Sequence, residues 1–418
     1  MTNNGPSYPH SGGTPGSRAP FPQQANPTWL GQVEPRYYRP APHDGGGVRP
    51  VLPPAYPAAG QRATRGLAGL VAAGGVLSLL GLFMVLPFLL QRTGAAGFVV
   101  GFVASLVPLS AVLLAVFVID RWEPEPKRLL LFAFMWGAVV SIAVTMLIQP
   151  FFALAAGPAA GLDPTTFAAT VQAPVVEEFA KSLGLLLILL FARKHFDGPV
   201  DGVVFAFTIA GGFAFTENIL YFGRAIAGSD TPGAELAAVF FLRGVMSPFA
   251  HAIFTGTTGL VLGLAARRAG PGLSVVAFGV GLVPAMVLHS SWNSMGSDFL
   301  VQYLFVQVPI FLATVLVIVL LRVAENRLTR QRLREYAAAG WFAASEVDVL
   351  ATASGRRTAL RWAASSGRRP QMKAFLRAAT RLAFTRQRVL SGRDVAAHQL
   401  DERHQLAHIA VLRDAVLR

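Results

Sequence analysis

The sequence contains no cysteine and few charged residues. Of its 418 residues, 53% are hydrophobic and only 14% are Asp, Glu, Lys or Arg, a balance that soluble domains with a charged surface rarely reach. The lack of cysteine excludes disulfides, thiolate nucleophiles, and zinc or iron–sulfur sites with Cys ligands. Any metal must be held by His, Asp, Glu or Asn. The composition indicates an integral membrane protein.

Acidic residues are scarcer than basic ones, and the net charge is +14. The basic residues gather before the first apolar run, in alternate loops, and in the last part of the chain. This asymmetry indicates membrane topology and lipid contact. The first apolar run begins near residue 66, too late for a cleaved signal peptide, so we expect it to be retained as a span.

Long apolar runs, by contrast, are abundant. A helix needs about 20 apolar residues to cross the hydrocarbon of a bilayer, and eight stretches reach that length. They cover residues 66–90, 98–119, 129–155, 165–192, 203–223, 235–265, 273–294 and 299–321. The predicted fold is therefore an all-α, polytopic membrane helix bundle with about eight transmembrane helices. Alternation of Lys and Arg between the loops predicts that both termini are cytoplasmic.

Two regions flank this predicted transmembrane core of residues 66–322. Residues 1–65 are rich in Pro, Gly, Ser and Asn and are expected to form a disordered cytoplasmic arm. Residues 323–418 are Arg-rich with apolar residues at helical spacing, which predicts a basic, amphipathic, helical tail that contacts anionic lipid. No nucleic-acid partner is expected, because no fold signature or aromatic stacking pattern accompanies the charge. The high usage of Ala, Gly and Arg suggests a bacterial cell-membrane protein from a GC-rich genome.

Ionisable residues inside the predicted spans are few, and each is costly in hydrocarbon. The set consists of Glu177, Glu178 and Lys181 on the fourth span, Glu217 on the fifth, Arg243 and His251 on the sixth, and His289 on the seventh. The lysine follows the two glutamates by three and four residues, so it can neutralise either of them on one helix face. Asn293 follows His289 by four residues and shares its face. We interpret the three glutamates and two histidines as one shared site, with Lys181 as either a charge partner or a helix-interface residue.

Carboxylates and imidazoles without cysteine suit two chemistries. One is activation of water by a general base, with or without a metal held by His and Glu. The other is a proton or cation relay in a membrane transporter. A non-catalytic scaffold that recruits partners through its arm and tail is a third reading. Asn293 fits an oxyanion stabiliser better than a relay element. A transporter often has matching interrupted spans in the two halves of its chain, and this sequence shows no such pair. The residues alone leave the alternatives open.

Four motifs resemble, in the same order, those of PrsW-type intramembrane proteases, which belong to the superfamily of CAAX-processing and bacteriocin-processing enzymes. They are VVEEFAKS at 175–182, FAFTENILYF at 213–222, SPFAHAIFTG at 247–256 and HSSWN at 289–293, and DRWEPEPKRLLL at 120–131 resembles the loop that commonly precedes them. The resemblance covers about residues 66–322. It implies hydrolysis of a peptide bond in a membrane-protein or peptide substrate, which in the family's best-known case is an anti-sigma factor.

The resemblance also assigns roles to residues. The candidate catalytic residues are Glu177, Glu178, His251, His289 and Asn293, and the candidate metal ligands, with Zn²⁺ as the expected ion, are Glu217, His251 and His289. We expect Glu177 to act as general base on a water oriented by His251, while His289 and Asn293 stabilise the oxyanion. Glu178 would hold a histidine or Lys181 in place, and Glu217 would either bind the metal or accept a hydrogen bond from one of its ligands. The wider superfamily usually has histidine at the position of Glu217, whereas the PrsW branch has glutamate there.

Overall fold

The computed structural model describes residues 59–417, with short gaps at 123, 229, 268–270, 297 and 393–394. Every regular element within those residues is a helix, and they contain no strand. The predicted arm, residues 1–65, lies outside the described residues apart from 59–65, which begin the first helix. The described chain forms two compact units, one that ends at Glu325 and one that begins at Asn326.

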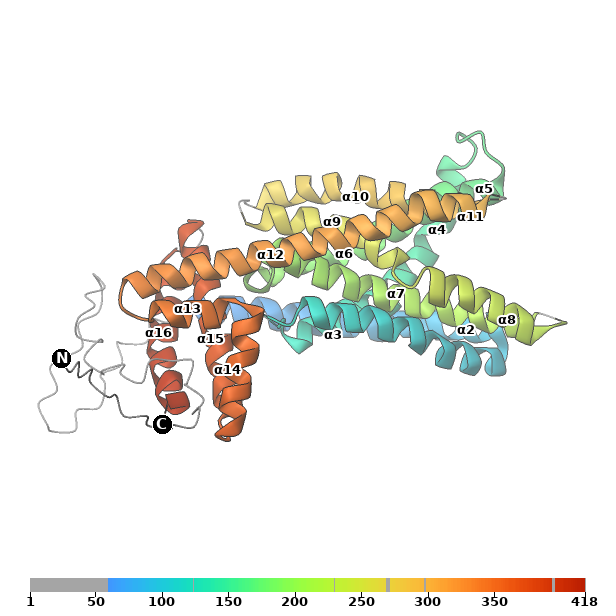
Figure 1. The fold of residues 1–418 in the computed structure, drawn as a ribbon. Helices are drawn as coiled ribbons and strands as arrows, with labels where there is room; N and C mark the ends of the chain where they lie inside the picture. The colour runs from blue at the N-terminus through green and yellow to red at the C-terminus, as the bar shows by residue number, and fades with distance from the viewer. Residues whose placement is uncertain are drawn as a thin grey trace, which may run out of the picture. The chain divides into compact units, whose positions relative to one another are not determined.

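The first unit holds the apolar helices (Figure 1), and several of them continue into π-helical segments, which are named η in the text. Its elements are α2 (Ala59–Ile119), α3 (Lys127–Met135), η1 (Trp136–Ser141), α4 (Ile142–Ala156), α5 (Pro164–Phe167), η2 (Ala168–Gln172), α6 (Ala173–Phe191), the 3₁₀ turn η3 (Arg193–His195), α7 (Pro199–Ala227), α8 (Pro232–Phe240), η4 (Phe241–Met246), α9 (Ala250–Ala266), α10 (Pro271–Asn293), α11 (Phe299–Gln302), η5 (Tyr303–Gln307) and α12 (Val308–Ala338).

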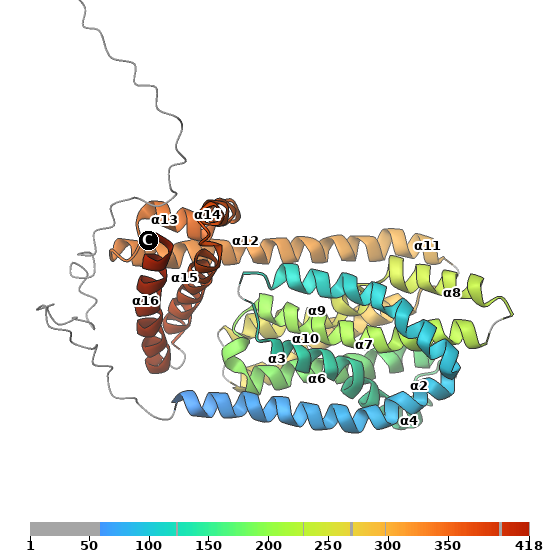
Figure 2. The ribbon, with the colours of Figure 1, turned by 90° about the horizontal axis from the view of Figure 1, so that it is seen from below.

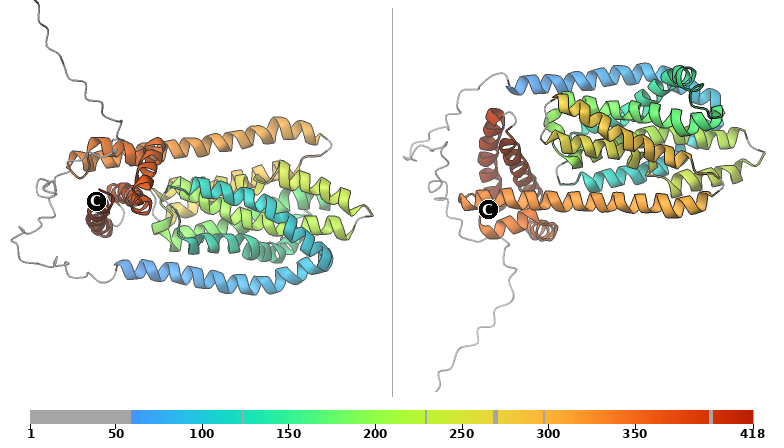
Figure 3. Two further views of the ribbon diagram at one scale, coloured as in Figure 1. Left: turned by 60° about the horizontal axis from the view of Figure 1, so that its bottom comes forward. Right: turned by 90° about the horizontal axis from the view of Figure 1, so that it is seen from above.

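The predicted all-α bundle with about eight spans is confirmed in outline. Six helical stretches in the described residues are long and apolar enough to cross a membrane. The first of them, α2, contains two predicted spans, because the chain turns at Gly94, whose φ of 66° suits glycine. Figures 2 and 3 show α2 running along one side of the bundle, turning and coming back. The fourth predicted span corresponds to α6. This helix is not among the six apolar stretches because it carries three charged side chains.

The sixth predicted span, residues 235–265, is not one continuous helix. The chain leaves helical geometry at Ser247 and Phe249, on either side of Pro248, and so separates α8–η4 from α9. Proline lacks an N–H and disfavours helical geometry in the residue before it, which accounts for the break at this position. His251 consequently lies in the first turn of α9.

Helix α7 is mostly buried and packs against α2, α3, η1, α6 and α9. Its contact with α9 is close, because a Cβ atom added at Gly202 would lie 2.0 Å from the carbonyl oxygen of Gly259. Small residues at such crossings let helix backbones approach in membranes. This contact sets the spacing between the helices that carry Glu217 and His251.

The second unit contains the end of α12 and four further helices with their own apolar core. These are α13 (Ala344–Ala351), α14 (Ala353–Ser365), α15 (Arg369–Leu390) and α16 (Val395–Leu417). Core side chains from all five include Leu333, Leu350, Ala363, Phe375 and Ile409. The expected tail is helical and basic, but its apolar faces pack against one another rather than being left free for lipid. The reason is that five helices in sequence can bury those faces together.

Candidate active site

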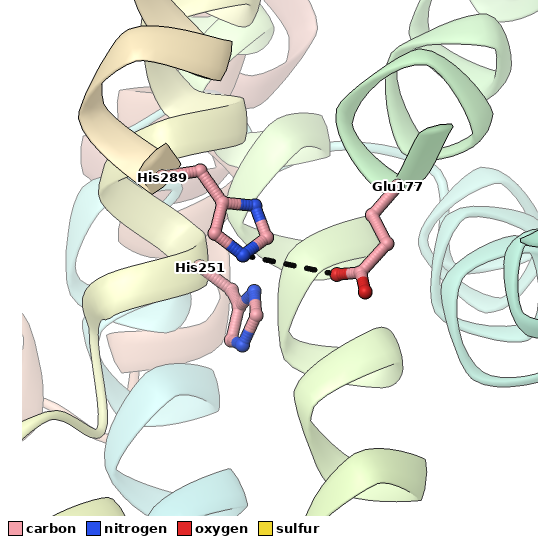
Figure 4. Close-up of side chains that lie close together, drawn as sticks. All are labelled: Glu177, His251 and His289. Atoms are coloured by element: carbon pink, nitrogen blue, oxygen red, sulfur yellow. Dashed lines mark ion pairs between the residues drawn. The ribbon is translucent and has the colours of Figure 1, made fainter. Parts of the chain in front are cut away.

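The unit that ends at Glu325 brings together acids and imidazoles that are far apart in the sequence. Glu177 on α6, His251 on α9 and His289 on α10 each offer one ligand atom, and these three atoms lie within 4.8 Å of one another (Figure 4). Glu177 and His289 are buried, and His251 is partly buried. The carboxylate and the two rings point toward a common point between their helices.

A second carboxylate orients each histidine ring. Nδ1 of His289 lies 3.0 Å from Oε1 of Glu178, which leaves Nε2 facing Oε2 of Glu177 at 3.9 Å. Nε2 of His251 lies 2.9 Å from Oε2 of Glu217. Because a carboxylate accepts a hydrogen bond, these contacts assign N–H to Nδ1 of His289 and to Nε2 of His251. The other nitrogen of each ring then carries a lone pair, which in His251 faces the Lys181 amine at 3.2 Å.

Glu178 and Lys181 form a fully buried ion pair on α6, with 2.5 Å between Oε1 and Nζ. Glu178 also accepts a hydrogen bond from the Thr255 hydroxyl at 2.8 Å, and the Lys181 amine lies over the Phe213 ring. Nζ of Lys181 lies 3.2 Å from Nδ1 of His251. A buried charge pair with its remaining positions satisfied in this way keeps a fixed geometry.

Glu217 is paired with Arg243 of η4 as well as with His251. Nη2 of Arg243 lies 3.0 Å from Oε2 of Glu217, and its Nε donates to Asn218 at 2.8 Å. The guanidinium also stacks over the Tyr221 ring at 3.9 Å. These contacts make Arg243 part of the site, although the sequence indicates only that an arginine lies within a span. Thr255 carries no sequence signal at all.

The residues fit a metal ion. Oε2 of Glu177 is buried and accepts no hydrogen bond from any residue in the described part of the chain. Two imidazole nitrogens and this carboxylate form the His₂Glu donor set of many catalytic zinc sites, and the carboxylates behind the rings are the partners that ligand histidines usually have. Of the two roles predicted for Glu217, its place behind His251 fits the hydrogen-bond acceptor, and the geometry groups Glu177 with the two histidines.

Asn293 does not join this group. It is partly buried, and its amide donates to the backbone oxygen of Ala169 at 2.9 Å, while Ser290 donates to that of Thr170 at 2.6 Å. Both bonds fasten α10 to η2, close to the start of α6. The side chain that was expected to stabilise an oxyanion therefore fixes the position of the helix that carries His289.

Comparisons with known proteins agree with the motifs. The model of the PrsW family of intramembrane metalloproteases matches residues 125–323. Protease PrsW of Oceanobacillus iheyensis is 30% identical over 162 residues, which are 39% of this chain and 67% of that protein. Protease PrsW of Geobacillus kaustophilus is 30% identical over 165 residues, 39% of this chain and 65% of that protein. Protease PrsW of Bacillus subtilis is 29% identical over 190 residues, 46% of this chain and 79% of that protein. No solved structure matches the chain.

Proposed function

Because the chain belongs to the PrsW family of intramembrane metalloproteases, we propose that it hydrolyses a peptide bond of a membrane-protein substrate at the group formed by Glu177, His251 and His289. Family membership makes the chain a membrane protease and decides against a transporter or a scaffold. The observation that carries the proposal is the buried oxygen of Glu177, which accepts no hydrogen bond from the described residues and faces two oriented imidazoles.

The ion proposed for this site is Zn²⁺, held by Glu177, Nδ1 of His251 and Nε2 of His289. When bound, it would supply a water whose pKa is lowered to about 7 and would polarise the scissile carbonyl. The orienting bonds from Glu178 and Glu217 support this assignment, because each fixes the tautomer that leaves the ligand nitrogen free. Lys181 contacts that nitrogen of His251, so its amine must withdraw when an ion is bound.

In the proposed reaction a water molecule adds to the scissile carbonyl carbon and its proton passes to Oε1 of Glu177, because Oε2 is the oxygen assigned to the ion. The same proton then moves to the departing amine nitrogen, so that the products are a carboxylic acid and an amine. The amine of Lys181, buried beside Glu177, supplies positive charge and hydrogen-bond donors for the oxyanion. With Asn293 bonded to η2, Lys181 takes the place that was expected for that amide.

The substrate and the topology are also proposed. An anti-sigma factor that is anchored in the membrane fits the family's best-known role, and the site lies on helices that are apolar outside it. The distribution of Lys and Arg among the loops supports cytoplasmic termini.

The test combines Glu177→Gln and His289→Ala with a matched control, Glu235→Gln. Glu235 is exposed in the first turn of α8 and has no role in the site. We expect both site variants to insert in the membrane at normal levels, to lose stoichiometric zinc in elemental analysis, and to leave a co-expressed single-span substrate uncut. The control should keep both metal and cleavage. Normal cleavage by Glu177→Gln would overturn the proposal, and cleavage with no metal in the wild-type protein would overturn its zinc component.

A further inference from the structure

The unit that begins at Asn326 carries most of the protein's excess positive charge. Residues 326–418 contain 18 Lys and Arg against seven Asp and Glu, which gives +11 of the total +14. The charge is concentrated further in α14 and α15, because residues 353–390 contain ten basic residues and no acidic one. Helix α16, by comparison, has nearly equal numbers of basic and acidic residues.

The basic residues of α15 form one continuous exposed stripe. Between Met372 and Thr385, the exposed side chains are those of Lys373, Arg377 and Arg381. Their spacing of four residues, about 6 Å along a helix, places them on the same face. Arg357 and Arg361 are also exposed, at the same spacing on α14, which packs against α15. None of these five side chains forms an ion pair with a residue in the described part of the chain.

The opposite face of α15 is apolar and buried. Met372, Phe375, Leu376, Ala379 and Leu382 are all buried in the core of the unit. The apolar face that an amphipathic helix would insert into lipid is thus covered, and only the cations remain available for a partner. Such a surface attracts a polyanion by charge without inserting into it.

The helix that connects the units narrows the choice of partner. Helix α12 contains the last apolar span and continues unbroken to Ala338, inside the second unit. The basic surface is therefore tethered a short distance from the bilayer, where anionic headgroups are present at high effective concentration. No exposed aromatic side chain lies between the cations of α15 to stack with bases, which argues against single-stranded nucleic acid.

We propose that the surface formed by Lys373, Arg377 and Arg381 binds the anionic headgroups of the adjoining leaflet, and that Arg357 and Arg361 of α14 add to the positive charge that attracts them. The contact is electrostatic and is made at the membrane surface, without insertion of the helix into the bilayer. It places the second unit against the membrane when anionic lipid is present and releases it when the charge is screened. It does not depend on the proteolytic reaction.

The absence of cysteine permits a direct test with the full chain. A donor dye on Gln371→Cys, an exposed position on α15, reports energy transfer to a headgroup-labelled acceptor lipid in nanodiscs. We expect transfer to be clearly higher in discs with about 30% anionic lipid than in neutral discs. At about 1 M salt, where the Debye length is near 3 Å, it should return to the neutral value.

Two triple variants with the same net charge distinguish the effect of this surface from the effect of the protein's net charge. Lys373→Gln, Arg377→Gln and Arg381→Gln together should remove most of the increase caused by anionic lipid. Arg327→Gln, Arg334→Gln and Arg403→Gln together remove three other exposed arginines and should retain it. Thermal unfolding of both should match the parent, since none of the six side chains forms an ion pair among the described residues.

Three results would overturn the proposal. One is equal transfer in neutral and anionic discs, and another is an equal loss in both triple variants. The third is a dye that responds to short RNA or polyglutamate but not to anionic discs, which would assign the surface to a soluble polyanion.

Discussion

At the scale of single residues, the site depends on how the two histidine rings are held. Each ring has one nitrogen against a carboxylate and one turned inward, so Glu178 and Glu217 decide which lone pair is available. Five acidic or imidazole side chains gathered in one place are tolerated because Lys181 is paired with Glu178 and Arg243 with Glu217.

The orienting role of Glu217 predicts a partial and reversible defect. Glu217→Gln keeps an oxygen that accepts from His251 but loses the negative charge behind the ring. We expect zinc affinity to fall about 10- to 100-fold, as is typical for partners of ligand histidines, and cleavage to recover when zinc is added. Metal titration and cleavage at several zinc concentrations measure both effects. Glu177→Gln is the comparison, because it loses a ligand and should not recover. A Glu217→Gln variant that zinc cannot rescue would contradict the orienting role.

At the scale of elements, the crossing of α7 and α9 fixes the distance between Glu217 and His251. A side chain at Gly202 has no room, since its Cβ would lie 2.0 Å from a backbone oxygen that cannot swing aside. The helices must separate to accept it, and the hydrogen bond of 2.9 Å across them would lengthen.

Gly202→Ala is therefore expected to reduce both stability and cleavage. Overpacking of this kind costs about 1–3 kcal/mol of the free energy of unfolding. Gly279→Ala on α10 is the matched control, because a Cβ there meets no atom within 4 Å, and its effect should stay within about 1 kcal/mol. Thermal unfolding in detergent and cleavage rates test the pair. Equal behaviour of the two variants would show that the crossing does not limit the site.

At the scale of the whole molecule, the Glu/His group and the basic surface lie in separate compact units. The second unit contains a buried ion pair of its own, in which Nη2 of Arg413 lies 2.9 Å from Oε2 of Glu346. The same oxygen accepts from the backbone N–H of Ala343 at the start of α13.

Breaking this pair should affect the second unit alone. Arg413→Met leaves a buried carboxylate without its partner and is expected to destabilise the unit by about 3–5 kcal/mol. Adding Glu346→Gln removes the unpaired charge, keeps an acceptor for Ala343, and should restore much of the loss. Hydrogen exchange in α13 and α16 measures the stability of the unit, and cleavage in detergent should stay near the wild-type rate. Loss of cleavage in Arg413→Met would show that the two units are coupled.

The sequence is sufficient to predict the apolar helices and the proximity of Glu177, His251 and His289. It does not identify Thr255 or the partners of Arg243. It also places Asn293 in the site, although a spacing of four residues on α10 shows only that Asn293 and His289 share a helix face. It predicts amphipathic helices in residues 323–418, but helical spacing shows only that a helix has an apolar face and not what covers that face.

The sequence by itself determined that this chain crosses a membrane about eight times and that its few buried charges belong to protease motifs. These conclusions depend on the type of each residue and on the cost of placing it in hydrocarbon, which are local properties. Only the tertiary structure decided that Glu177 joins the two histidines while Glu217 lies behind one of them, and that the apolar faces of the basic helices cover each other. Those outcomes depend on how each helix is rotated and where it crosses its neighbours, which contacts between residues far apart in the sequence determine.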